Sequence, residues 1–298
     1  MEAMDLLKIT EAEKKALKGR GLILTNDGEH FIARIVAPNG VFTNEQMQMV
    51  TDVARKYGDG RVALTVRLTI EIQGVPYENL EPLVAEVEAA GLVTGGTGSI
   101  VRPVVACKGT VCVHGLFDTQ AFAKRIYDEF FVGWHNVTLP HKFKIAVGGC
   151  PNNCVKPDLN DLGVIGQRVP SHDLSKCRGC KVCQIEKACP IGASRLGESR
   201  LDWNEDMCNH CGRCVGKCPF GVVGEEKRGY AVYIGGRWGK RTAQGRMLAH
   251  VFTSEEEVLE VIERALTLFR DEGSAGERFS DTVNRLGFEN VQNRLLGR

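Results

Sequence analysis

The cysteines constrain this chain more than any other feature of its sequence. There are twelve, and eight of them lie between Cys177 and Cys218. The N-terminal stretch MEAMDLLKITEAEKK lacks the apolar run of a secretory signal, and no segment approaches the roughly 18 apolar residues of a membrane-spanning helix. Without a secretory signal, so many thiols indicate metal binding rather than disulfides. We therefore expect a cytoplasmic protein with metal-bound cysteines and no membrane span.

Length and charge narrow the classes further. The chain has 298 residues, which predicts two or more domains, and its 43% apolar and 25% charged content excludes fibrous and disordered classes. The net charge is +1, so no long-range field steers the protein to nucleic acid or to an anionic membrane. Recognition of any anion must depend on a local cluster of basic side chains.

The first third of the sequence predicts a small α+β layer. A helix opens at Thr43, with Gln46 in capping-box position, and Met47, Val50, Ala54 and Tyr57 mark its buried face. Residues 61–73 alternate strictly between apolar and polar side chains, as expected for one half-buried strand. The other expected elements are a strand at 31–37, a helix at 79–90 and a strand at 100–106.

A similar α/β pattern flanks the segment that is dense in cysteine. Before it we expect a helix near 119–130 and a strand at 142–147, and after it a strand at 230–234 and a helix at 254–270. The dense segment therefore has the character of an insertion. The expected division is an N-terminal domain (1–100), a second domain in two pieces (101–170 and 229–298) and an inserted domain (171–228).

The inserted segment contains two cysteine triplets, each followed by a Cys-Pro pair. The spacings are C-x2-C-x2-C-x5-C-P from Cys177 and C-x2-C-x2-C-x3-C-P from Cys208. A zinc ribbon is the alternative, but zinc sites usually have two C-x2-C pairs rather than two triplets. The pattern resembles the bacterial two-cluster ferredoxins. The resemblance implies two [4Fe–4S] clusters, one on Cys177, Cys180, Cys183 and Cys218 and the other on Cys189, Cys208, Cys211 and Cys214.

Four cysteines remain, as the pairs Cys107/Cys112 and Cys150/Cys154. From their spacing alone they are compatible with a third cubane, with a zinc ion or with four buried free thiols.

The surrounding residues resemble the sirohaem-dependent sulfite and nitrite reductases over nearly the whole chain. GGCPNNCVKPDLNDLGVIG is similar to the second cysteine pair of that family, LPHKFK to its anion-binding lysine strand and VRLTIEIQ to its N-terminal arginine strand. The first pair departs from the family, since KGTV supplies four intervening residues where five are usual. The implied fold is α+β: a ferredoxin-like N-terminal layer and a sirohaem and [4Fe–4S] domain that carries the inserted ferredoxin domain.

The resemblance also implies a function and a set of site residues. The cofactors are sirohaem and three [4Fe–4S] clusters, with Cys154 as the axial link to the sirohaem iron. Sulfite is the expected substrate, and nitrite or another small oxyanion is the alternative; a further alternative is an electron-transfer subunit without sirohaem. The implied pocket residues are Arg67, Arg102, Lys142 and Lys144, with Arg237, Lys240 and Arg241 as weaker candidates, whereas His135 and His141 are not expected to bind haem.

Two further expectations concern partners and substrate. Assimilatory relatives contain two such repeats, so one repeat implies a homo-oligomer or a related subunit, together with an electron donor. At the second arginine of the R-x-T-x-R strand, this chain has Glu71. Alternation places Glu71 on the same strand face as Arg67. We therefore expect one of three outcomes: Glu71 pairs with a nearby cation, a cation from a second subunit replaces the missing charge, or the substrate is not sulfite. We also expect Glu71→Arg to preserve or improve sulfite binding.

Overall fold

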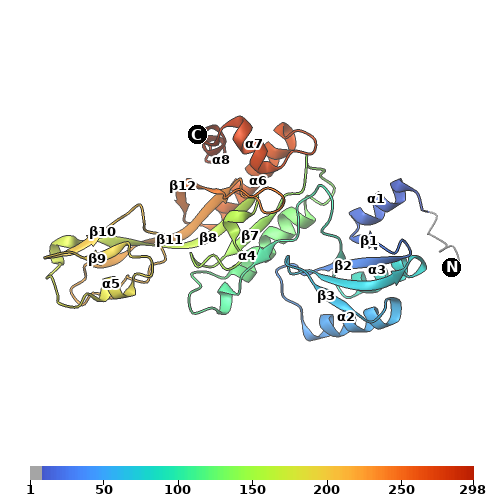
Figure 1. The fold of residues 1–298 in the computed structure, drawn as a ribbon, viewed down its shortest axis with the longest axis horizontal. Coiled ribbons are helices and arrows are strands. Elements are labelled where there is room, and N and C mark those ends of the chain that lie inside the picture. Colours follow the sequence, from blue (N-terminus) through green and yellow to red (C-terminus); the bar gives the residue numbers. More distant parts are fainter. Residues whose placement is uncertain (1–8) are drawn as a thin grey trace.

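The computed structural model describes residues 9–298, so the first eight residues of the charged N-terminal stretch lie outside it. The molecule is elongated, and three parts follow one another along its longest axis (Figure 1). The N-terminal domain lies at one end, a central domain carries the C-terminal helices, and a small lobe rich in cysteine lies at the other end. No helix within residues 9–298 combines the length and apolar character needed to cross a membrane.

The N-terminal domain is a sheet of order β1-β2-β4-β3, in which β5 also pairs with β2. The expected capping box of Thr43 and Gln46 is confirmed. Met47 was wrongly expected in the core: it is 41% exposed, and Val53 is buried instead. The elements are α1 (Glu11–Gly19), β1 (Leu22–Leu24), β2 (His30–Val36), α2 (Asn44–Tyr57), β3 (Val62–Leu64), β4 (Ile70–Pro76), a 3-10 turn (Tyr77–Asn79), α3 (Leu80–Ala89) and β5 (Val93–Thr94).

The single strand expected at 61–73 is wrong, because the chain reverses there. β3 and β4 form an antiparallel hairpin in which Leu64 faces Ile70, and its turn is closed by a 2.6 Å hydrogen bond between the hydroxyls of Thr65 and Thr69. Alternation of apolar and polar residues does not record the direction of the chain, so the pattern of a hairpin matches that of one long strand. The turn leaves Leu64 81% exposed and Val66 96% exposed.

The central domain is a mixed sheet of order β12-β11-β8-β7-β6. β6, β7 and β8 are parallel, whereas β8, β11 and β12 are antiparallel. The strands expected at 100–106 and 142–147 are shorter than predicted, so Lys142 and Lys144 precede β7. The elements are β6 (Val105–Ala106), a 3-10 turn (Gly109–Val111), α4 (Thr119–Ile126) with a π-helical continuation (Tyr127–Val132), β7 (Ile145–Gly148), a 3-10 turn (Pro157–Leu159), β8 (Leu162–His172), β11 (Val223–Ile234), β12 (Arg246–Phe252), α6 (Glu255–Glu272), α7 (Phe279–Leu286) and α8 (Phe288–Leu295).

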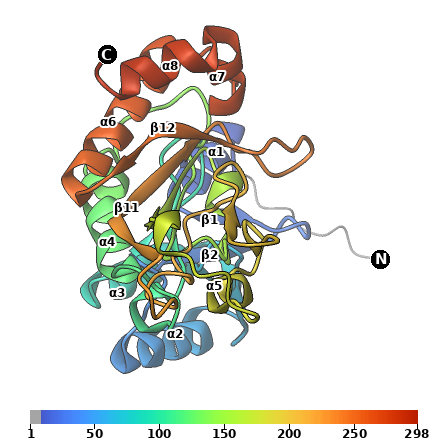
Figure 2. The same ribbon diagram turned by 90° about the vertical axis from the view of Figure 1, so that its left-hand side faces the viewer.

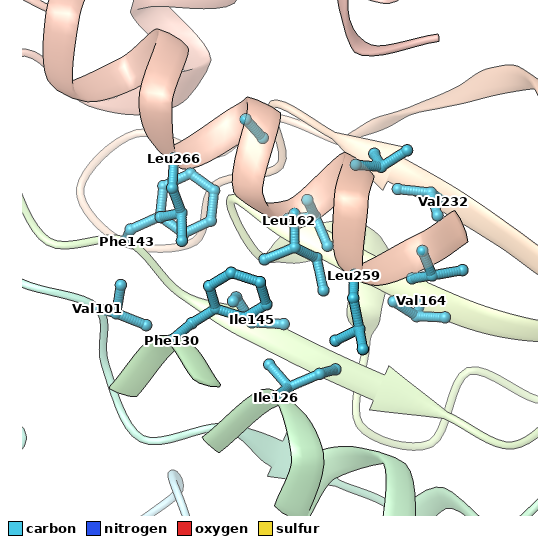
Figure 3. Close-up of a cluster of buried hydrophobic side chains, with 14 of the residues drawn as sticks. Val101, Ile126, Phe130, Phe143, Ile145, Leu162, Val164, Val232, Leu259 and Leu266 are labelled. Atoms are coloured by element: carbon cyan, nitrogen blue, oxygen red, sulfur yellow. The ribbon is translucent and has the colours of Figure 1, made fainter. Parts of the chain in front are cut away.

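One face of the central sheet is covered by α4 and α6. Figure 3 shows Ile145, Leu162 and Val164 of the sheet beside Ile126 of α4 and Leu259 of α6. The apolar stripe expected on the last long helix is confirmed, since all of its members are buried: Val258, Val261, Ile262, Ala265 and Phe269. The helices thus occupy one face of the sheet.

The lobe is continuous with the sheet through a two-stranded ribbon. β8 and β11 stay paired as far as His172 and Val223, and residues 173–222 lie between those ends. The lobe contains a 3-10 turn (Leu174–Lys176), α5 (Gln184–Ala188), β9 (Ser194–Leu196) and β10 (Leu201–Trp203). Its core is small and includes cysteine side chains beside apolar ones: Ile185, Leu201, Val222 and Val223 with Cys177, Cys183, Cys214 and Cys218.

Candidate functional site

Parallel pairing brings the two central cysteine pairs together. Cys107 follows β6 and Cys150 follows β7, and the carboxyl ends of adjacent parallel strands meet at one edge of a sheet. The Sγ of Cys107 accepts a 3.1 Å hydrogen bond from the amide of Gly149. The pKa of Cys150 is raised by burial and by the neighbouring thiols of Cys107, Cys154 and Cys112. The four cysteines therefore form one group, in which Cys154 is the exposed member.

The loop that carries Cys154 is fixed to the sheet and to the β11–β12 hairpin. Pro157 packs on two glycines of the sheet, and a Cβ at Gly163 would lie only 2.3 Å from the Pro157 carbonyl oxygen. Asp158 accepts hydrogen bonds from Asn153 (2.7 Å) and from Gln244 (3.0 Å). The loop around Cys154 is thus held by local contacts with the sheet and by one distant residue, Gln244.

A second group of cysteines lines a hollow in the lobe. Its members are the four that the ferredoxin resemblance assigned to one cluster: Cys189, Cys208, Cys211 and Cys214. Burial and the neighbouring thiols, Cys208 first, raise the pKa of Cys214 to about 11. Thiols with raised pKa values gain most from a bound cation, because only the thiolate binds metal and burial otherwise disfavours that charge.

The spacing of these groups bears on the kind of metal they suit. Within residues 9–298, no three His, Cys, Asp or Glu side chains lie close enough together to hold one metal ion. The ligands of a cubane surround eight atoms and stand further apart than the four ligands of a zinc ion. Each group supplies four thiols, which is the donor set of a [4Fe–4S] cluster.

The basic residues expected to bind an anion lie at the amino ends of β6 and β7, opposite the ends that carry the cysteines. Arg102 precedes Cys107 by five residues, which is roughly 16 Å along a strand. Burial first, and then the positive charges of Arg67, Arg278 and Lys142, lower the pKa of Lys144 to about 8, against the attraction of Asp161. The pKa of Lys142 is also lowered by burial. Three of the expected pocket residues, Arg102, Lys142 and Lys144, therefore share one electrostatic environment.

Arg102 has a nitrogen that is free for a ligand. Its Nη1 donates to the carbonyl oxygen of Gly96 at 2.6 Å, but its Nε is buried and has no partner. Burial and the charges of Arg34 and Arg278 lower the pKa of Arg102 to about 10, which keeps it protonated at neutral pH. A buried donor without an acceptor is costly in a protein, so this nitrogen fits an anionic group of a ligand.

Asp161 and Arg278 lie under this cluster and were not foreseen from the sequence. Asp161 is fully buried, and both of its carboxylate oxygens lie 2.9 Å from Nη2 of Arg278. Asp161 also accepts a 2.9 Å hydrogen bond from the amide of Lys144. Asp161 lies within the GGCPNNCVKPDLNDLGVIG motif, but Arg278 is 117 positions away and outside the quoted motifs, so no local pattern indicates the pair.

Arg67, which was expected to bind the cofactor, contacts the central domain. From the β3–β4 turn it reaches the central domain, where Nη2 donates to the carbonyl oxygens of Pro103 (2.6 Å) and Ile145 (3.1 Å) and Nη1 donates to Asn160 (3.0 Å). These bonds join the two domains and occupy most of the guanidinium. Only the buried Nε lacks a partner, as in Arg102, so cofactor binding by Arg67 stays a prediction beside its interdomain contact.

The weaker cofactor candidates lie on the β11–β12 hairpin, which projects from the body in Figure 2. Arg237 is not free, because it forms a 2.9 Å ion pair with Asp281. Lys240 and Arg241 are exposed at the tip. The neighbouring Trp238 is 61% exposed, and the Nζ of Lys156 lies 5.7 Å from its ring centroid.

His141 borders the cation cluster, whereas His135 and a large cavity lie elsewhere. Nδ1 of His141 accepts a hydrogen bond from the amide of Lys142 at 2.8 Å. His135 lines a cavity of about 960 Å³ beside α1 and α3, whose lining contains no cysteine. That cavity is therefore separate from the cysteine site.

Glu71 pairs with a neighbouring cation, which was one of the three expected outcomes. It is the cross-strand partner of Arg34, whose Nε and Nη2 donate to it at 3.0 and 2.5 Å. The proposed approach of Glu71 to the face of Arg67 is wrong, because Arg67 lies in the turn and not on the same strand. Glu71 thus neutralises Arg34 and does not present a free carboxylate to the pocket.

Comparison with known proteins agrees with this arrangement. Residues 97–297 match the family model described as "Nitrite and sulphite reductase 4Fe-4S domain", and residues 23–90 match "Nitrite/Sulfite reductase ferredoxin-like half domain". Coenzyme F420-dependent sulfite reductase of Methanocaldococcus jannaschii is 31% identical over 88% of this chain, which spans only 41% of that protein. An anaerobic sulfite reductase subunit of Salmonella typhimurium is 28% identical over 79% of this chain and 73% of its own length.

A solved structure shows the same fold. Dissimilatory sulfite reductase I superposes with a TM-score of 0.71 at 23% identity, covering 89% of this chain and 69% of that one. The family model covers most of the central domain, both central cysteine pairs and the cation cluster, and the half-domain model covers the N-terminal sheet. This chain therefore belongs to the nitrite and sulfite reductase family of sirohaem and [4Fe–4S] oxidoreductases.

Proposed function

We propose that the protein reduces sulfite to sulfide at a sirohaem, with electrons relayed through three [4Fe–4S] clusters. In this proposal, Cys107, Cys112, Cys150 and Cys154 would hold one of the clusters, and Cys154 would also serve the sirohaem. The other two clusters occupy the lobe as an inserted ferredoxin domain. When bound, the sirohaem and its cluster supply the electrons for the reduction.

The cation cluster is the observation that carries this proposal. Sulfite and the carboxylates of sirohaem are anions, and charge-assisted hydrogen bonds from Arg102, Lys142 and Lys144 suit both. Conversion of sulfite to hydrosulfide consumes six electrons and seven protons and releases three waters. Because burial and neighbouring charges bring the pKa of Lys144 to about 8, its ammonium group is a suitable proton donor at neutral pH.

Steady-state kinetics test the substrate and the pocket together. Lys142→Ala and Lys144→Ala should each weaken sulfite turnover strongly, whereas Lys124→Ala should not, because Lys124 is an exposed lysine paired with Asp128 on α4. Nitrite is the second candidate substrate, and the ratio of kcat/KM for the two anions decides between them. Wild-type rates in both pocket variants with either anion would place the pocket elsewhere.

A second candidate function is an electron-transfer subunit without sirohaem. It is favoured by the finding that Arg67 and Arg237 are already bonded within the protein, which leaves fewer cations for a tetrapyrrole. The visible spectrum and iron content of anaerobically purified protein separate the two functions. The reductase requires red-region tetrapyrrole bands and about thirteen iron atoms per chain, whereas the alternative has neither the bands nor the haem iron.

We also propose that the site is completed by a second copy of this chain or by a related subunit. β3 is an edge strand, and the exposed apolar residues Leu64 at its end and Val66 in the following turn are unusual at a free edge, which is normally protected by charge. Light scattering of wild-type protein and of Leu64→Lys tests this. A dimer that Leu64→Lys dissociates supports the proposal, and a monomeric wild type that turns over sulfite contradicts it.

A further inference from the structure

One cysteine group of the lobe faces the central site. Arg213 lies between Cys211 and Cys214, and its Nη2 is 3.4 Å from Oδ1 of Asn152 and 3.5 Å from Nε2 of His114. Asn152 lies between Cys150 and Cys154, and His114 follows Cys112 by two residues. The group formed by Cys189, Cys208, Cys211 and Cys214 is therefore the inner one.

The other cysteine group of the lobe is the outer one, further from the central site. Its members are Cys177, Cys180, Cys183 and Cys218. Cys180 is exposed, as are the residues on both sides of it. The lobe that contains it projects from the central sheet at the far end of the β8–β11 ribbon (Figure 1). A redox group at this position is accessible to a protein that cannot reach the central site.

The surface around Cys180 combines positive charge with apolar side chains. Lys176, Arg178 and Lys181 are exposed, and no acidic residue occurs among residues 174–185. The guanidinium of Arg178 lies 4.4 Å from the ring centroid of Phe220, and Val182 is 52% exposed. We call this surface, formed by Lys176, Arg178, Lys181, Val182 and Phe220, the outer face.

Acidic groups near the outer face do not cancel its charge. Asp173 forms a 3.0 Å ion pair with Lys176, and Glu186 on α5 accepts a hydrogen bond from the amide of Leu196. Arg178 and Lys181 have no carboxylate partner within the described part of the chain. Interfaces of this kind, an apolar centre with a charged rim, attract partners of opposite charge and accelerate their association.

We propose that the outer face docks an acidic one-electron carrier protein of the ferredoxin type and that electrons enter at the Cys177, Cys180, Cys183 and Cys218 cluster. This inference rests on one part of the proposed function, namely that the lobe binds two [4Fe–4S] clusters. One electron passes from the reduced carrier to the outer cluster, so the carrier is oxidised and the cluster reduced, with no bond broken and no proton moved. The inner group then lies between the entry cluster and the central site.

Stopped-flow reduction of the cluster-loaded protein by a reduced acidic bacterial ferredoxin tests this. Arg178→Glu/Lys181→Glu should slow reduction of the lobe clusters at least tenfold at low ionic strength, and the wild-type rate should fall steeply with salt. The matched control is Lys15→Glu/Arg55→Glu, which makes the same change of charge at two exposed positions of the N-terminal domain. Reduction of both variants by dithionite should remain at the wild-type rate, and interferometry should show weaker ferredoxin binding only for the first variant.

The result that overturns the proposal is equal ferredoxin affinity and equal reduction rates in Arg178→Glu/Lys181→Glu and in the control. Because the measurements follow the lobe clusters and direct binding, they do not depend on sulfite turnover. A protein without sirohaem bands whose lobe is still reduced through the outer face would contradict the proposed function and leave this inference standing.

Discussion

Asp161→Asn is the substitution for which the structure predicts the largest effect. Asp161 is fully buried and lies 2.9 Å from Nη2 of Arg278, which is itself buried. Burial raises the pKa of Asp161, whereas the Arg278 guanidinium and the amide of Lys144 lower it. If Asp161 is ionised, asparagine leaves Arg278 as an uncompensated buried charge, which costs about 3–5 kcal/mol.

Calorimetry measures this loss. For a domain of this size, it corresponds to a decrease of roughly 6–20 °C in the melting temperature of the central domain. Asp281→Asn is the matched control, because it removes the same charge from a half-exposed pair with Arg237 and should cost less than about 1 kcal/mol. Asp161→Asn/Arg278→Gln should recover part of the loss, since no buried charge is left unpaired. Equal melting temperatures for Asp161→Asn and Asp281→Asn would refute the reasoning and indicate that Asp161 is neutral in the folded protein.

Three further predictions concern the site. Because the pKa of Lys144 is about 8, sulfite binding should weaken as the pH rises through that value and the ammonium loses its proton, whereas Lys144→Arg should retain binding at higher pH. Binding titrations between about pH 6.5 and 9.5 measure this. An identical pH profile in both proteins would contradict the prediction. Cys154→Ser should lose or uncouple the sirohaem while the lobe clusters remain, and Cys211→Ala should do the opposite, as absorption and magnetic-resonance spectra report. From the sequence, Glu71→Arg was expected to preserve or improve sulfite binding. The structure predicts instead that it lowers the melting temperature and weakens binding, because the new guanidinium would lie opposite that of Arg34. An unchanged melting temperature would contradict this.

The sequence by itself determined the features that depend on local spacing. The capping box at Thr43 and the buried stripe of the last long helix are set by residues three or four positions apart, and the structure confirms both. Three motifs were sufficient to indicate the family, because each is contiguous: GGCPNNCVKPDLNDLGVIG, LPHKFK and VRLTIEIQ.

Only the tertiary structure decided the features that depend on contacts between distant segments. The reversal after Leu64 could not be read from alternation, and it moved Arg67 from a strand face to a contact with the central domain. Asp161 and Arg278 meet through the fold alone, and burial there lowers the pKa of Lys142 and Lys144. The order of the cysteine groups likewise depends on Arg213 reaching Asn152 across the lobe boundary. Charge, burial and distance are properties of the folded arrangement, so the chemistry of the site was decided there and not in the sequence pattern.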